Sequence, residues 1–481
     1  MLLFPYKYFS SPLKAFSRLI LTDAYACTEK WNSRFSSNTF GNLSASDLGT
    51  QIQYRLNNRA SITPLDYDIF VNKVQQSSKS FLDFLETTTY KFRETQNSLK
   101  TLPSTHHAFV RDYIHHNEIE RVLDILKNRA QTGIFLDEVS ANLLQESFIK
   151  KEDFSSALSV MWELCLQSHL EQEQLRPYLT ALWLHTANEL IRSDVLFERS
   201  EVVEEVEEEI DMDTDFQSVP YLRNPNYDGW FDIRRPRLQL GHCLFSLSSA
   251  IENDLSPIFS PSMAINLKDL VPRLRLLAYA LVEDSKNLLA FANSLLKSNV
   301  FDTEVLSVAE KLIESSDRRT DDSEIRKGVP ILLTESEVAS TLEQFKVMTS
   351  GLTPSRKSFH TTIDEIVKSI TTDASIQAAE IELVESLYSD FESTRAAVWK
   401  NEAELHRRRE VISTVKSRLR SLADEEERIS YFENVDTIEH RAWLAPRTRS
   451  ERQWSRLKEW KKDLREYQQR HEGGRDTAES L

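Results

Sequence analysis

The apolar positions of this chain repeat at an offset of 35 residues over two neighbouring stretches, 104–138 and 139–173. Tyr113 in the first stretch corresponds to Phe148 in the second. In each stretch, apolar residues recur at helical spacing, a polar turn follows, and a second helical stripe begins. Each unit is therefore predicted to be two short antiparallel helices. Such a period lies within the roughly 20 to 45 residues that are typical of stacked helical repeats.

Further helices are predicted on both sides of these units. Pro64, Pro103 and Pro177 each precede a helical stripe, at the first-turn position where the missing N–H of proline costs nothing. The stretch 65–95 predicts an additional, poorly matched hairpin, and 179–191 predicts a third, degenerate unit. Decayed terminal units are expected, because the end of a stack has no neighbour to cover its apolar face.

The C-terminal part of the chain predicts very long helices, because residues 355–445 contain neither glycine nor proline. One apolar seam recurs there every seven residues, which is the spacing of a coiled coil. Its members are Val384, Phe391, Val398, Leu405, Ile412 and Leu419. The companion seam is apolar only at its ends. We therefore expect a helix that packs along one narrow stripe, within a hairpin or against a partner, in preference to a homodimeric coiled coil.

Composition supports an all-α fold. Only nine of the 481 residues are glycine, which leaves few for hairpin turns or phosphate-binding loops. The net charge of −16 argues against a protein that coats nucleic acid over its whole surface, because phosphate neutralisation needs an excess of Lys and Arg. The prediction is an all-α solenoid of helical hairpins followed by a long, charged C-terminal helical region, with any RNA contact confined to part of the surface.

Five regions are expected along the chain. They are a transit peptide (1–22), helical repeats (23–200), an acidic linker with an irregular segment (201–235), a second helical region (236–350) and long C-terminal helices with a basic tail (355–481). The linker is assigned because nine of its first fifteen residues are acidic, and like charges repel one another.

The first 22 residues are basic and carry no acidic side chain. Lys7, Lys14 and Arg18 are spread among apolar residues and serines, and the first acid is Asp23. This composition is typical of a mitochondrial transit peptide, whereas a secretory signal would have an uninterrupted apolar core. An ordinary basic helix is the alternative. The segment predicts import into the mitochondrial matrix.

Candidate chemistry is sparse, and we expect no enzyme, no cofactor and no metal site. The nucleotide-binding and hydrolase motifs are absent from the sequence. Three widely spaced cysteines form neither a disulfide framework nor a zinc-ligand set. The histidine cluster is expected to occupy turn and surface positions because it lacks the spacing of zinc ligands. Its members are His106, His107, His115 and His116. No apolar stretch reaches the length of a membrane span, so no membrane contact is expected.

The repeat units resemble pentatricopeptide repeats. The run TGIFLDEVSANLLQESFIKKEDFSSALSV (132–160) is similar to the corresponding stretch of the family of mitochondrial small-ribosomal-subunit proteins numbered twenty-seven. LTDAYACTEKW (21–31) and YKFR (90–93) are smaller matches to the same family. The resemblance is close over 105–170 and no longer visible after 240. It implies a structural, RNA-contacting protein of the mitochondrial small ribosomal subunit that supports mitochondrial translation.

The resemblance also suggests base-reading residues. Repeat proteins of this type read one base per unit through polar side chains, one early in the first helix and one that closes the unit. Here the pairs would be His107 with Asp137 and Asn142 with Gln172. His107 and Gln172 depart from the usual residue types, which favours contact with folded RNA or proteins over base reading. Asp137 and Asn142 could equally be helix caps.

A basic segment near the C-terminus is the second candidate for RNA contact. Residues 441–470 hold ten basic side chains against four acidic ones, with three tryptophans among them. Aromatic rings beside Arg and Lys suit bases and phosphates. The alternative is a solvated amphipathic helix whose tryptophans pack on the preceding helix. The predicted contacts are Arg441, Arg447, Arg449, Arg452, Arg456, Lys458, Lys461 and Lys462.

Three functions remain open from the sequence. The first is a structural component of the mitochondrial small subunit, with ribosomal RNA and neighbouring ribosomal proteins as partners. The second is a free mitochondrial repeat protein that binds mRNA or tRNA and regulates translation or stability. The third is a solenoid adaptor that binds only proteins, which the overall acidity favours.

Overall fold

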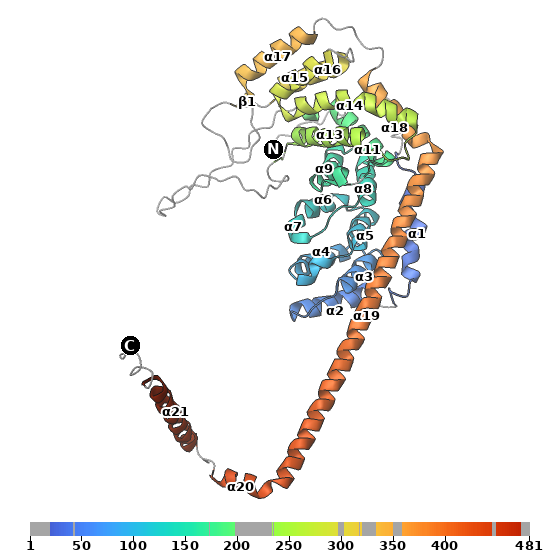
Figure 1. The fold of residues 1–481 in the computed structure, drawn as a ribbon. Helices are drawn as coiled ribbons and strands as arrows, with labels where there is room; N and C mark the ends of the chain where they lie inside the picture. The colour runs from blue at the N-terminus through green and yellow to red at the C-terminus, as the bar shows by residue number, and fades with distance from the viewer. Residues whose placement is uncertain are drawn as a thin grey trace, which may run out of the picture. The chain divides into compact units, whose positions relative to one another are not determined.

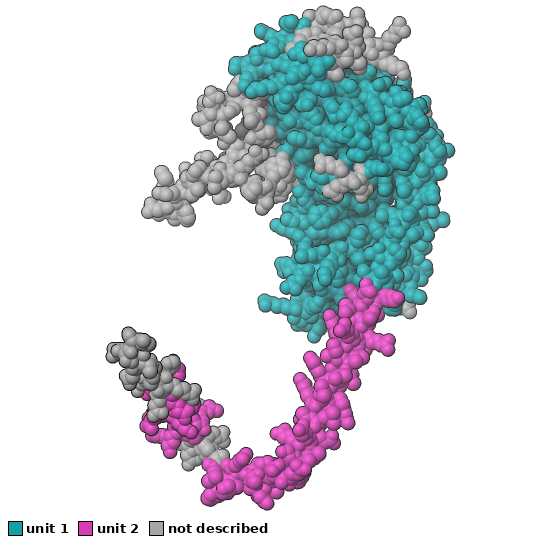
Figure 2. All heavy atoms as spheres, viewed as in Figure 1, with its two compact units in different colours: residues 1–399 teal, residues 400–481 magenta. Residues whose placement is uncertain are grey.

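The computed structural model describes most of the chain, in two compact units, 1–399 and 400–481 (Figure 2). The described residues are 20–41, 44–172, 174–197, 233, 235–296, 303–316, 318–319, 333–349, 358–444 and 449–472. Most of the predicted transit peptide (1–19) and of the predicted linker (201–232 and 234) lies outside them. The boundary between the units falls inside the predicted C-terminal region, and the five-region division stays a prediction.

The first unit begins with a stack of helical hairpins, as the repeat pattern predicts (Figure 1). Short helices precede the stack: η1 (Asp23–Ala26), α1 (Thr28–Ser33), η2 (Arg34–Ser36) and α2 (Ala45–Asn57). The hairpins are formed by α3 (Pro64–Val74) with α4 (Phe81–Arg93), α5 (Pro103–His115) with α6 (Ile119–Lys127), and α8 (Glu138–Lys150) with α9 (Phe154–Leu166). The first helices pack in order, α3 on α5, α5 on α8, and α8 on α11 (Pro177–Arg192). The short segments between them are η3 (Gln96–Lys100), α7 (Arg129–Thr132) and α10 (His169–Gln172).

The two repeat units share their turn geometry as well as their apolar pattern. Asn117 and Glu152, which are equivalent positions, both adopt left-handed backbone angles, with φ of 58° and 60°. The next amide in each unit donates to the carbonyl five residues earlier, from Glu118 to Tyr113 (2.9 Å) and from Asp153 to Phe148 (3.1 Å). These bonds satisfy the last carbonyls of the first helix. Tyr113 and Phe148 are both fully buried in one continuous core, so the stacked repeat is confirmed.

The second helical region extends the same core. After η4 (Asp194–Phe197), which follows α11, the region contains α13 (Pro236–Asn253), α14 (Pro261–Val282), α15 (Ser285–Leu296), α16 (Thr303–Glu314) and α17 (Glu335–Thr349). Two strands of two residues, β1 (Arg318–Arg319) and β2 (Leu333–Thr334), pair in parallel. Leu175 bonds the backbone on both sides of Leu255, and α13 packs on α9. This region therefore closes the end of the hairpin stack.

Four helices complete the described part of the chain, and the predicted all-α fold is confirmed. Helix α18 (Phe359–Thr372) packs on α11, and α19 (Ala374–Glu433) follows after one residue. The 60 residues of α19 match the stretch without glycine or proline, and helices α20 (Val435–Leu444) and α21 (Arg449–Glu472) come after it. Residues 374–399 belong to the first unit, and the rest of α19 belongs to the second.

Candidate nucleic-acid interface

The predicted readers His107 and Asp137 do meet in the structure. Nδ1 of His107, in the first half of α5, lies 3.0 Å from Oδ2 of Asp137. Asp137 caps α8, where its side chain also accepts a hydrogen bond from the Ser140 amide. The capping alternative for Asp137 is therefore confirmed. Burial lowers the pKa of His107, so at neutral pH the ring is uncharged and its Nδ1–H donates to the carboxylate.

His107 is buried under aromatic rings from other parts of the chain. The Trp31 ring lies 4.9 Å away between centroids, and the rings of Tyr388 and Phe391 from α19 lie 5.3 and 5.6 Å away. None of its surface is exposed. The expectation of turn and surface positions for the histidine cluster is therefore wrong for His107. The signal that could have shown this was its place on the apolar face of α5.

For the second pair, Asn142 and Gln172, only the side chain of Asn142 is among the described residues. Asn142 is fully buried on α8, and its Nδ2 donates to the hydroxyl of Tyr25 at 3.0 Å. Gln172 is the last residue of α10, and its side chain lies outside the described part of the structure. Because the side chains of His107 and Asn142 are both buried against this chain's own segments, the fold disfavours base reading by these pairs.

The first part of α19 covers the face formed by the first helices of the hairpins. At one end, Nε of Arg395 pairs with Oδ2 of Asp68 on α3 at 2.7 Å, and both side chains are buried. Further along, the hydroxyl of Tyr388 accepts a hydrogen bond from the Arg111 guanidinium of α5. The seam residues Val384 and Phe391 are part of the buried core. This face, which the repeat pattern offers to a partner, is therefore occupied by the chain itself.

Glu380 is the most unusual group in this contact. It is completely buried on α19, and no side chain among the described residues donates a hydrogen bond to either of its oxygens. Burial, together with the nearby carboxylate of Glu138, raises the pKa of Glu380 to about 7. The covering helix therefore carries a titratable group whose ionisation opposes its own packing.

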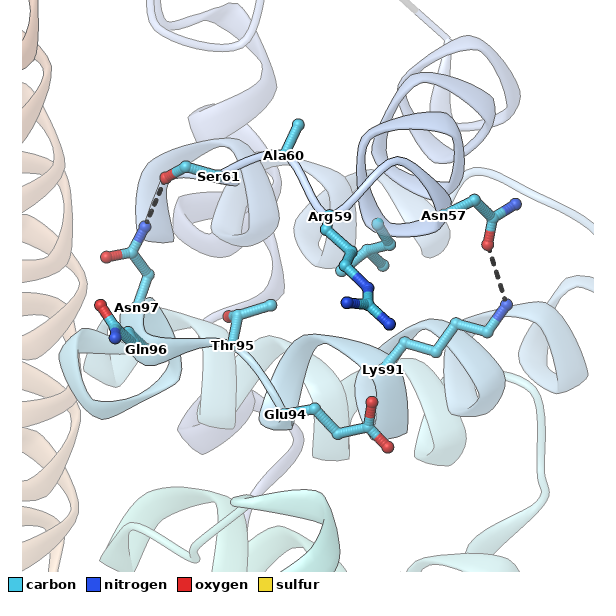
Figure 3. Close-up of a pocket in the computed structure, with 10 residues that line it drawn as sticks. Asn57, Arg59, Ala60, Ser61, Lys91, Glu94, Thr95, Gln96 and Asn97 are labelled. Atoms are coloured by element: carbon cyan, nitrogen blue, oxygen red, sulfur yellow. Dashed lines mark hydrogen bonds between the residues drawn. The ribbon is translucent and has the colours of Figure 1, made fainter. Parts of the chain in front are cut away.

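A polar hollow of about 500 Å³ lies between the ends of α2 and α4 (Figure 3). Arg59 and Lys91 line it with Glu94, and Nδ2 of Asn97 donates across its wall to Ser61. No polar side-chain atom of its lining is both buried and without a partner. The hollow is open and internally hydrogen-bonded, so it indicates no particular ligand.

The predicted basic tail is exposed wherever its side chains are described. Arg441 lies on α20, and Arg456, Lys458, Lys461 and Lys462 lie on α21, all in exposed positions. The backbones of Arg449 and Arg452 belong to α21, but their side chains lie outside the description, as does all of Arg447. Trp443, Trp454 and Trp460 expose 60 to 67% of their surface. The alternative in which these tryptophans pack on a preceding helix is therefore not seen.

Helix α21 separates three kinds of side chain around its axis. At 3.6 residues per turn, Trp454, Leu457, Trp460, Leu464 and Tyr467 form one apolar face. Lys458, Lys461, Lys462 and Arg465 lie along one edge of that face. Glu459, Asp463 and Glu466 lie on the remaining side. The helix thus presents flat aromatic rings next to a row of positive charges.

No metal centre and no membrane span is found in the described part of the chain. His, Cys, Asp and Glu side chains gather nowhere there in a group of three or more that could hold a metal ion. The described helices include none that is long and apolar enough to cross a bilayer. The features that remain for an interface are the exposed basic and aromatic side chains of α20 and α21.

Comparison with known families decides what kind of protein carries this surface. The model of the family described as mitochondrial 28S ribosomal protein S27 matches residues 3–421. The chain belongs to this family. The resemblance of 132–160 is confirmed, and membership implies a mitochondrial location, with ribosomal RNA and other mitochondrial ribosomal proteins as partners. The match ends within α19, so α20 and α21 lie beyond the part of the chain that the family model covers.

Proposed function

We propose that this chain is a structural, non-enzymatic component of the mitochondrial small ribosomal subunit that works in the matrix, supports mitochondrial translation and contacts ribosomal RNA through α21. Family membership supports the ribosomal setting. The observation that carries the RNA contact is the exposed face of α21, where Trp454 and Trp460 stand beside Lys458, Lys461 and Lys462.

The chemistry of α21 suits single-stranded or irregular RNA. Each base stacked on an exposed aromatic ring contributes about 1–3 kcal/mol, and neighbouring cations pair with phosphates. The rest of the chain is acidic, so long-range attraction to RNA must come from a local basic surface of this kind. Arg441 on α20 and Arg456 on α21 are further exposed basic side chains, and Arg447, Arg449 and Arg452 remain predicted contacts.

The hairpin stack has a different role in this proposal. Its face of first helices is filled by α19 and by the segment around Tyr25 and Trp31, so it contributes a rigid body in place of a base-reading groove. Its remaining outer surface is available to neighbouring ribosomal proteins. Transfer RNA and messenger RNA are not required as partners.

The test is the salt dependence of attachment to the small subunit. We would compare the full chain with the variant Lys458→Gln, Lys461→Gln, Lys462→Gln by sedimentation of mitochondrial small subunits through sucrose at increasing KCl. The variant should leave the particle at lower salt, because the lost phosphate contacts weaken its binding to RNA. Each lost contact should also reduce the steepness with which log affinity falls against log salt by about 1. The matched control is Glu459→Gln, Asp463→Gln, Glu466→Gln on the same helix, which should release no earlier than the parent. Release of the lysine variant and the parent at the same salt would contradict RNA contact by α21.

A further inference from the structure

The second half of α19 carries an apolar stripe that no described residue covers. Leu405, Val411, Ile412, Val415, Leu419 and Leu422 expose 43 to 60% of their side chains. We call these six residues the distal stripe. Three of them, spaced by seven, continue the seam whose earlier members Val384 and Phe391 are buried in the first unit. Aliphatic side chains at this spacing are typical of a helix that packs against another helix.

Positive side chains border the distal stripe on both sides. Arg409, Lys416 and Arg420 lie along one edge, and Arg407 and Arg418 lie along the other. The single acid between 405 and 422, Glu410, lies on the opposite face and pairs with His406 at 3.3 Å. Arg409, Lys416 and Arg420 form no ion pair within the described residues. Arg408 lies within the stripe itself, one heptad before Val415. The stripe is thus an apolar strip interrupted by one Arg and bordered by two rows of available positive charge.

From this arrangement we propose that the distal stripe docks a helix of a neighbouring protein whose own apolar stripe is flanked by Asp and Glu. Charge complementarity selects the acidic flanks, because opposite charges across an interface set the partner and the register. The proposal rests on membership in a ribosomal protein family and not on RNA contact by α21.

The same observations disfavour other occupants. The segment 405–422 contains no Phe, Tyr or Trp on which bases could stack, in contrast to α21. A second copy of the chain would bring one pair of basic borders against another, and like charges facing each other are destabilising. An anionic lipid surface would meet the run Asp424 to Glu427, which is acidic at every position directly after the stripe.

The experiment is site-specific photocrosslinking in intact particles. The photoreactive residue p-benzoyl-phenylalanine replaces Ile412 in the distal stripe or, as the matched control, Ser417 on the opposite face of the same helix. Mitochondrial small subunits that contain the full-length tagged chain are irradiated, treated with ribonuclease and analysed by peptide mass spectrometry. We expect a crosslink from position 412 to one defined segment of another protein, with acids beside helically spaced apolar residues, and at least a tenfold lower yield from position 417.

A charge reversal tests the acidic flanks separately. The variant Arg409→Glu, Lys416→Glu, Arg420→Glu should lower the crosslink yield from position 412 at least fivefold, and Ser413→Glu with Ser417→Glu should leave it within a factor of two. Five results would overturn the proposal: a crosslink to RNA, to lipid or to a second copy of the chain, equal yields from positions 412 and 417, or no crosslink at 412. An undiminished yield after charge reversal would also overturn it. None of these results bears on the salt test of α21.

Discussion

One apolar seam runs along both parts of α19, but it is buried in the first part and exposed in the second. Before residue 399, the seam is buried against the first helices of the hairpin stack, and Arg395 beside it pairs with Asp68 inside the protein. After residue 400, the same seven-residue spacing continues through Leu405, Ile412 and Leu419, which are exposed. The seven-residue apolar spacing therefore identifies the face of the helix that packs against another surface. The charged residues beside that face determine which surface fits.

The largest expected difference between the two parts comes from a buried charge. Arg395→Met would leave the carboxylate of Asp68 buried without its ion-pair partner, so we expect a loss of about 3–5 kcal/mol in the free energy of unfolding. The matched control Arg408→Met, in the exposed part of the same helix, should change it by less than about 0.5 kcal/mol. Urea unfolding of the full-length variants measures both, and equal effects would remove the contrast.

The next contrast concerns the seam itself. Phe391→Ala should destabilise the protein by about 3 kcal/mol, because it removes a buried ring that lies against His107 and leaves a cavity. Ile412→Ala should be close to neutral in the purified chain, since no described residue covers Ile412. Thermal unfolding followed by circular dichroism would compare them. A cost at Ile412 similar to that at Phe391 would show that the distal stripe is covered within the chain.

The covering helix should also respond to pH through Glu380. Its pKa is raised to about 7. Between the pKa of the unfolded chain and this value, the folded protein keeps the proton that the unfolded chain has released. The free energy of unfolding therefore falls as pH rises from about 5 to 8. Glu380→Gln removes this ionisation. It should make the protein more stable than the parent by about 3 kcal/mol at pH 8, and by only about 1 kcal/mol at pH 5. Urea unfolding across this pH range measures the difference.

The control for that measurement is Glu385→Gln, an exposed position on the same helix. It should follow the parent at every pH. A constant offset between the Glu380→Gln variant and the parent from pH 5 to pH 8 would mean that Glu380 stays ionised in the folded protein.

The smallest expected effect locates the boundary between the two parts. Val398 is half-buried, packed on a small cluster that includes Phe40, Leu65 and Ile69. Val398→Ala should therefore cost about 1 kcal/mol, between the effects expected at Phe391 and at Leu405. Replacement of Leu405 by Ala should be nearly neutral. Chemical unfolding measures the stability of both variants. A larger stability loss at Leu405 than at Val398 would mean that the buried part of α19 extends beyond residue 400.

Much of this architecture could be predicted from local signals. The proline at the start of α3, α5 and α11, the 35-residue offset and the uninterrupted run 355–445 are all visible in the sequence, and each corresponds to an observed element. These signals depend on neighbouring residues, which is why they can be recognised without tertiary information.

The occupant of the repeat face could not be predicted in the same way. The seam around Val384 and Phe391 shows that one side of α19 is apolar, but periodicity contains no information about what covers it. Asp68 and Arg395 are 327 residues apart, and neither has a neighbour in sequence that indicates the other. His107 and Asn142 are buried by contacts with segments that are distant in sequence. The rules of the repeat family contain no information about such contacts, so they suggest these two residues as RNA-reading positions.

The most direct test of this account is a map of RNA contacts in the native particle. Ultraviolet crosslinking of isolated mitochondrial small subunits, followed by mass spectrometry of the peptides of this chain, would identify the residues that touch RNA. Crosslinked peptides are expected from α21, around Trp454 and Trp460, and none from the covered faces of α5 and α8. RNA crosslinks at His107 or Asn142 would show that α19 leaves the repeat face in the ribosome, and they would contradict it.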